Sequence, residues 1–200
     1  MRRIKEIFLC LMAACLFTAC DVESGSDVIW DIAPVNFCIR ITDSEGHDLL
    51  DSIYQENIIK DVTVSYQGED YPLMTEQEYY KKRDGLSETR AYLPVFHGLL
   101  LRQYWGYRTF SAEGFEMEFG EFDGEENVDK RDITANLPHN QHLHLAYKNS
   151  FRWKSNGSPS KKTVFYLNGQ ELKDDAGKSG YFNFRYSQAN GYEYIPSKIK

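Results

Sequence analysis

The sequence has 200 residues, of which 42% are hydrophobic and 26% are charged. This composition is that of a globular protein and excludes a disordered chain or a membrane protein with several spans. The net charge of −7 argues against the basic surface by which proteins bind nucleic acid or anionic lipid.

Residues 1–19 predict an export signal. The segment begins with basic residues, continues with an apolar run over 7–17, and ends with the small residues Thr18 and Ala19 before Cys20. The apolar run is shorter than the roughly 20 residues that a membrane-spanning helix needs. We therefore expect the segment to be removed on export.

The segment 17–20, Phe-Thr-Ala-Cys, resembles the lipobox of bacterial lipoproteins and departs from it at Phe17, where Leu is usual. The resemblance implies that a peptidase cuts before Cys20 and that its thiol carries a diacylglycerol, which with a further acyl chain anchors a protein stably to a membrane. An ordinary signal peptide with an incidental cysteine is the alternative. Residues 20–27 are acidic and small, which predicts a tether and resembles the surface-export signals of Bacteroidetes-type lipoproteins.

Residues 28–200 predict a single β domain. Apolar and polar residues alternate over 35–41, 115–119 and 143–147, as in strands with one buried face. Runs rich in aromatic and β-branched residues add strands over 58–66, 92–97, 99–105, 163–167, 181–186 and 192–195. Tight turns are expected at Asn168-Gly169, Asp123-Gly124 and Asn190-Gly191. The expected fold class is all-β, an antiparallel two-sheet sandwich of the immunoglobulin-like or transthyretin-like kind, or a barrel.

At most one or two short helices accompany these strands. Thr75 and Glu78 have the spacing of a capping box, which predicts a helix ending near Gly85. Residues 48–56 place apolar side chains on one helical face and predict a second. Both segments are too short to form the core of a helical domain.

The layout as a whole is similar to that of small Bacteroidetes-type surface lipoproteins of uncharacterised function. The similarity rests on the lipobox, the acidic tether, a strand over 30–41, a turn at 46–51 and a hairpin at 165–169. Because these motifs are structural, the resemblance implies a location and a fold and leaves the activity open.

The sequence contains two candidate cation sites. His142 and His144 alternate along a predicted strand, so their imidazoles point to one side, with His139 upstream as a third zinc ligand. The loop 123–129 carries five oxygen-bearing side chains of the type that calcium prefers but lacks the EF-hand spacing. We favour a polar strand face for the histidines and a solvated turn for the loop, and we predict no metal.

Candidate catalytic groups are few. Glu116 and Glu118 lie on one strand face about 7 Å apart by backbone rise, which suits glycoside hydrolysis but is also usual on the solvent face of a strand. The Ser-x-x-Lys spacing at 158–161 lies in a loop without its partner motifs, and Cys38 lies in a strand, where a packed thiol is expected. The sequence has no G-x-S-x-G, P-loop or G-x-G-x-x-G motif. We therefore predict no catalytic residue and no cofactor.

Aromatic clusters form the remaining candidate, a ligand-binding surface. Tyr104, Trp105 and Tyr107 lie close to Arg102 in the sequence, and Trp153 precedes a polar loop. Further aromatic residues, Tyr181 among them, crowd the segment 181–194. Exposed rings stack on sugars or contact proteins, whereas packing in the core is the alternative interpretation.

The sequence thus predicts a non-enzymatic, lipid-anchored protein of the outer membrane that binds a glycan or a cell-surface protein. One alternative is an anchor or assembly subunit of a surface appendage, which would pair through a free edge strand. A second alternative is a small hydrolase that uses Glu116, Glu118 or the histidines at 139–144.

Overall fold

Short strands dominate the computed structural model, which describes residues 32–84, 97–105 and 112–196. The strands are β1 (Val35–Thr42), β2 (Thr63–Tyr66), β3 (Glu69–Thr75), β4 (Leu99–Trp105), β5 (Ala112–Phe122), β6 (Val128–Leu137), β7 (Gln141–Trp153), β8 (Pro159–Leu167), β9 (Gln170–Glu171), β10 (Tyr181–Ser187) and β11 (Gly191–Ile195). The helical elements are the 3-10 turn η1 (Ile59–Asp61) and the helices α2 (Glu76–Asp84) and α3 (Ala176–Ser179). Within the described ranges, no helix has the length and apolar character needed to cross a bilayer.

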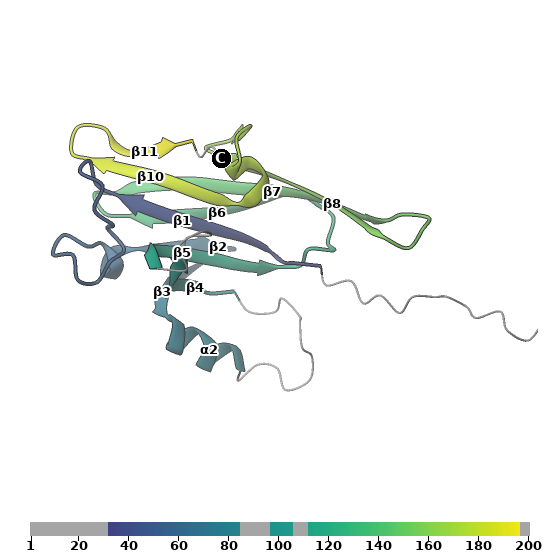
Figure 1. Cartoon of the computed structure of the whole chain (residues 1–200), viewed down its shortest axis with the longest axis horizontal. Coiled ribbons are helices and arrows are strands. Elements are labelled where there is room, and N and C mark those ends of the chain that lie inside the picture. Colours follow the sequence, from purple (N-terminus) through teal and green to yellow (C-terminus); the bar gives the residue numbers. More distant parts are fainter. Residues whose placement is uncertain (1–31, 85–96, 106–111, 197–200) are drawn as a thin grey trace, which may run out of the picture. The chain divides into compact units, whose positions relative to one another are not determined.

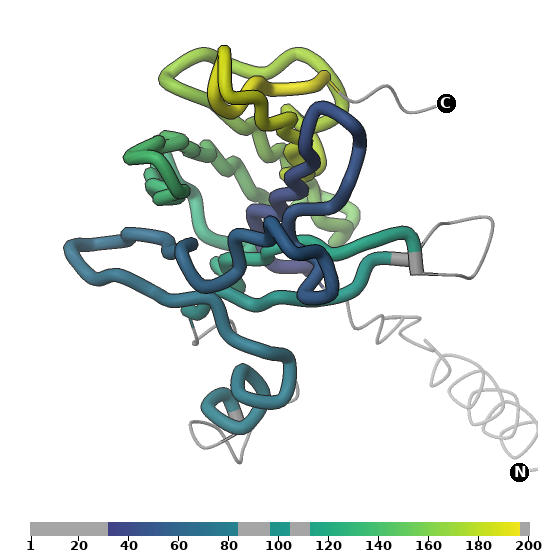
Figure 2. Tube along the Cα trace, turned by 90° about the vertical axis from the view of Figure 1, so that its left-hand side faces the viewer, coloured from purple at the N-terminus to yellow at the C-terminus, as the bar shows by residue number. Residues whose placement is uncertain are grey.

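The described strands form one curled sheet in the order β11-β10-β1-β5-β4-β3-β2-β6-β7-β8-β9 (Figure 1). This architecture confirms the all-β class. The pairs β1–β10 and β3–β4 are parallel, so the expectation of a purely antiparallel sheet is wrong at these two places. Figure 2, turned by 90° from Figure 1, foreshortens β1 and β10, whereas the β2–β3 hairpin runs across the view, so the direction of the strands changes along the sheet.

The concave side of the curl holds the core, and Phe37 of β1 lies at its centre. Its ring is fully buried and lies 5.8 Å from the ring of Tyr147 in β7 and 5.5 Å from that of Phe165 in β8. On its own half of the sheet it contacts Phe122 and Phe182, each at 6.2 Å. The edge-to-face contacts of Phe37 with Tyr147 and Phe165 therefore join the two halves of the strand order across the core.

The capping-box helix is confirmed as α2. The Thr75 backbone N–H donates to Glu78 Oε2 at 3.0 Å, and the Glu78 N–H donates to Thr75 Oγ1 at 3.4 Å. The helix lies on the outside of the sheet beside β3 and β4 (Figure 1), where Tyr79 packs on Met74 and Leu100.

The helix expected over 48–56 is wrong, because this segment consists of successive turns. The carboxylate of Asp48 accepts the N–H of Leu50 at 2.8 Å, and that of Asp51 accepts the N–H of Ile53 at 2.9 Å. Aspartates that bind the backbone two residues ahead favour turns and compete with the helical hydrogen bonds.

Most of the strand predictions are confirmed, as is the Asn168-Gly169 hairpin, whose residues have φ values of 50° and 80°. The strand expected over 58–66 begins only at Thr63, after η1. The strands β3 and β6 were not predicted. The export signal, the tether and the strand over 92–97, except for His97, lie outside the described residues.

Candidate functional site

Charged side chains gather on the convex side of the sheet, opposite the core. Along β5, Met117 and Phe119 enter the core, so Glu116 and Glu118 point outward. Arg102 of β4 stands opposite Glu116 in the register. Glu116 is only 1% exposed, so the expected solvent face of this strand is instead a buried polar cluster.

Two arginines hold Glu116, one on each carboxylate oxygen. Arg40 of β1 approaches Oε2 at 2.8 Å, and Arg102 approaches Oε1 at 2.8 Å. Arg102 also reaches Glu118 Oε2 at 2.8 Å, and the side-chain amide of Asn36 donates to the other oxygen of Glu118. Arg102 therefore bridges both carboxylates and fixes their positions.

A second ion pair lies beside the first. Arg83 of α2 approaches Glu121 of β5 at 3.1 Å, and the Glu121 N–H donates to Asn36 Oδ1 at 2.7 Å. Glu121 has a φ of 59°, which is unusual for a residue other than glycine, and the register of β1 with β5 shifts between Val35 and Phe37. Backbone strain and β-bulges of this kind are frequent near functional sites.

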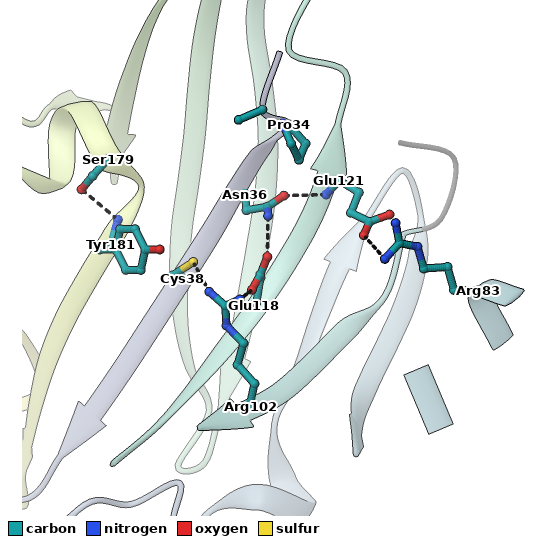
Figure 3. A pocket seen from close by; sticks show the side chains of 10 residues that line it. Pro34, Asn36, Cys38, Arg83, Arg102, Glu118, Glu121, Ser179 and Tyr181 are labelled. Atoms are coloured by element: carbon teal, nitrogen blue, oxygen red, sulfur yellow. Dashed lines mark hydrogen bonds and ion pairs between the residues drawn. The ribbon is translucent and has the colours of Figure 1, made fainter. Parts of the chain in front are cut away.

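These groups border a cavity of about 400 Å³, shown in Figure 3. We call it the charge-paired pocket, and its main lining side chains are Asn36, Arg83, Arg102, Glu118, Glu121 and Tyr181. The pocket combines the faces of β1, β4 and β5 with the end of α2 and the start of β10 (Figure 3). It is therefore built from segments far apart in the sequence.

The charges in the pocket are coupled. Burial raises the pKa of Glu118 and of Glu121, although Arg102 and Arg83 respectively oppose the rise. Burial lowers the pKa of Arg102, but the charges of Glu118, Cys38 and Glu116 outweigh it, so the pKa lies above its ordinary value. Each charge thus depends on its partner to stay ionised in a partly desolvated place.

Cys38, Glu116 and Glu118 place three potential metal ligands within 4.8 Å of one another. Burial, together with the two glutamates, raises the pKa of the Cys38 thiol, which disfavours the thiolate that binds metals or attacks substrates. Arg40 and Arg102 already hold the carboxylates. A cation would have to displace two guanidinium groups, so this arrangement suits fixed hydrogen-bonding groups better than a metal or an acid–base pair.

The predicted aromatic surface is not assembled by the described residues. The Arg40 guanidinium carbon lies 3.7 Å from the centroid of the Tyr104 ring and covers one of its faces. Trp153 is 51% exposed on the β7–β8 hairpin, which projects beyond the rest of the sheet (Figure 1), and β3, β2 and β6 separate its strand from that of Tyr104. Trp105 is the last residue of β4, but its side chain is not among those that the structure describes. Tyr107 and Cys20 lie outside the described residues altogether.

The three histidines each have a partner of their own. His142 and His144 share one exposed face of β7, as expected, and contact polar side chains of β6 at 2.9 and 3.2 Å. His139, in the preceding turn, stacks on Tyr186 of β10 at 5.4 Å. The rings thus take part in separate contacts instead of converging on one point.

The acidic loop 123–129 is tied into the neighbouring strands. Glu126 pairs with Arg131 at 2.9 Å, and Asp129 pairs with Lys148 at 3.3 Å. These contacts agree with the interpretation of the loop as a turn.

The charge-paired pocket contains groups that the sequence had singled out for other reasons. The sequence indicates Glu116 and Glu118 as a carboxylate pair and Arg102 as a neighbour of the aromatic residues. Tyr181 belongs to the C-terminal aromatic cluster that the sequence indicates, whereas nothing in the sequence points to Arg83. Comparison of the chain with protein-family models, with curated proteins and with solved structures finds no match.

Proposed function

We propose that the chain is a lipid-anchored protein of the outer membrane whose β domain is a non-catalytic binding or accessory module. The N-terminal sequence that ends in Cys20 and the acidic residues after it support the location, as does the resemblance to Bacteroidetes-type surface lipoproteins. The observation that carries the binding function is the charge-paired pocket.

The pocket favours binding over hydrolysis. A glycosidase needs one carboxyl group that exchanges a proton and a second that acts on the substrate or on water. Glu116 is instead held by two arginines, and Glu118 by Arg102 and an amide. Groups fixed in this way recognise a ligand at a low entropic cost, because they are ordered before it arrives.

We further propose that the curled sheet works as a sandwich of the immunoglobulin-like or transthyretin-like kind. The contacts of Phe37 with Tyr147 and Phe165 support two layers that share one core. The strands β3 and β2 then join the layers along one side.

An assembly subunit is the second candidate. It is favoured by β11, which ends the order of the described strands and, among them, pairs with β10 alone. A free edge accepts a strand from a partner. Sedimentation over a range of protein concentrations tests this role: growth into higher oligomers would favour assembly, and a constant monomer mass would reject self-assembly.

The anchor is tested by Cys20→Ala, with Cys15→Ala in the signal segment as a matched control. The Cys20 variant should lose metabolic labelling with a fatty acid and should leave the washed membrane fraction. The Cys15 variant should keep both properties. Retention of an unlabelled Cys20 variant in washed membranes would contradict the lipoprotein assignment.

A further inference from the structure

We infer that the charge-paired pocket binds a neutral sugar. This inference rests on the proposed binding function and names its ligand. Apart from Tyr181, the site differs from the aromatic residues that the sequence suggested, because it is built on the face of β1, β5 and β4.

The first argument is charge balance. Each charged side chain that lines the pocket has its opposite partner there: Arg83 with Glu121 at 3.1 Å, and Arg102 with Glu118 at 2.8 Å. A charged ligand would lose its hydration and would find no unpaired countercharge among the described lining residues. A neutral ligand avoids this cost.

The second argument is the supply of hydrogen bonds. A guanidinium has five N–H donors, and a carboxylate has about four acceptor positions, so ion-paired arginines and glutamates retain groups for a ligand. The amide of Asn36, which contacts Glu118 and the backbone of Glu121, adds to this fixed set. Alternating donors and acceptors in fixed positions match the hydroxyl groups of a sugar, each of which both donates and accepts.

The third argument is the ring of Tyr181 in the pocket lining (Figure 3). The residue is 38% exposed, and the Arg40 guanidinium carbon lies 5.4 Å from the centroid of its ring. An accessible ring offers an apolar surface to the C–H face of a sugar. The cavity of about 400 Å³ is at the small end of the range of roughly 300–1,000 Å³ that is usual for ligand sites.

The strand order makes a peptide the less suitable neutral ligand. Extended peptides bind by adding a strand to a free sheet edge. The strands β10, β1, β5 and β4, which carry the pocket, each have neighbours on both sides. A peptide at this place would have no backbone ladder to join.

The test is isothermal titration of the full mature protein, purified in detergent, with the neutral disaccharides maltose, cellobiose and lactose. Digalacturonate, glucosamine and an end-blocked tetraglycine are titrated in parallel. We expect a neutral disaccharide to bind and Tyr181→Ala to weaken its binding about tenfold. Trp153→Ala, which removes an exposed ring elsewhere, should change the affinity less than twofold.

Three results would overturn the inference: no neutral disaccharide bound at about 10 mM, tighter binding of a charged sugar or of tetraglycine, or weakening by Trp153→Ala in place of Tyr181→Ala. Circular dichroism of each variant confirms that it is folded. Binding of tetraglycine alone would support the proposed binding function and would reject a sugar as the ligand. A sugar bound by a protein that lacks lipid on Cys20 would instead reject the anchor and keep this inference.

Discussion

Removal of the Arg102 charge should destabilise the fold strongly, because this residue neutralises two carboxylates. In Arg102→Met the apolar stem is largely kept and the guanidinium is lost. Among the residues that the structure describes, Glu118 then has no cationic partner in an ion pair, and Glu116 keeps only Arg40.

The magnitude follows from burial. Removing one partner of a buried ion pair costs about 3–5 kcal/mol, because the other charge is left uncompensated. The side chain of Glu116 is only 2% exposed, but that of Arg102 is 35% exposed, so solvent screens part of the interaction. We therefore expect the lower end, about 3 kcal/mol of unfolding free energy.

Urea denaturation followed by fluorescence measures the loss. Lys130→Met is the matched control, because the Lys130–Asp132 pair has the same 2.8 Å separation but is more than half exposed, and it should cost no more than about 1 kcal/mol. Adding Glu118→Gln to Arg102→Met should recover part of the lost stability, because it removes a stranded charge. Equal losses in Arg102→Met and Lys130→Met would refute the buried network.

Three further predictions concern single residues. The His47 ring donates a hydrogen bond to the Asp43 carboxylate, and this bond raises the pKa of His47. The stability that it contributes is therefore present below the unfolded value of about 6.5 and is lost as pH rises through the folded pKa. Asp43→Asn should lower this pKa in an NMR titration, and an unchanged value would be inconsistent with the contact. Gly120→Ala should lower the free energy of unfolding, measured by urea denaturation, by about 1–3 kcal/mol, because a Cβ would lie 2.5 Å from Asn36 Oδ1. An unchanged free energy of unfolding would contradict this close packing. Cys38 should react with a thiol reagent only after unfolding, since it is buried and its pKa is raised by burial; rapid reaction in the folded state would argue against this.

The sequence predicts the strands well where apolar residues either alternate with polar ones or follow one another in a dense run. The run Leu99–Trp105 coincides with β4, and 35–41 with nearly all of β1. The sequence does not predict β6, because its first half, residues 128–132, is mostly polar and shows no alternation of apolar and polar residues. The sequence does not predict β3, because Pro72 lies within it and proline normally argues against a strand.

The site was less predictable, because it depends on which strands are neighbours. The spacing of Glu116 and Glu118 in the sequence indicates that they share one face of a strand. Arg40, which holds Glu116, is 76 residues away from it in the sequence. Only the order β1-β5-β4 places the outward arginines beside the outward glutamates. Alternation predicts which side chains leave the core, and it does not predict that other side chains will bury them.

The most direct test of the account is a crystal structure of the protein in complex with the neutral disaccharide that binds it most tightly. The account predicts a sugar ring against Tyr181, hydroxyl groups on Glu118 and Arg102, and the ion pair between these two residues intact. A sugar bound at Trp153 instead, or a pocket in which Arg102 has left Glu118, would contradict it.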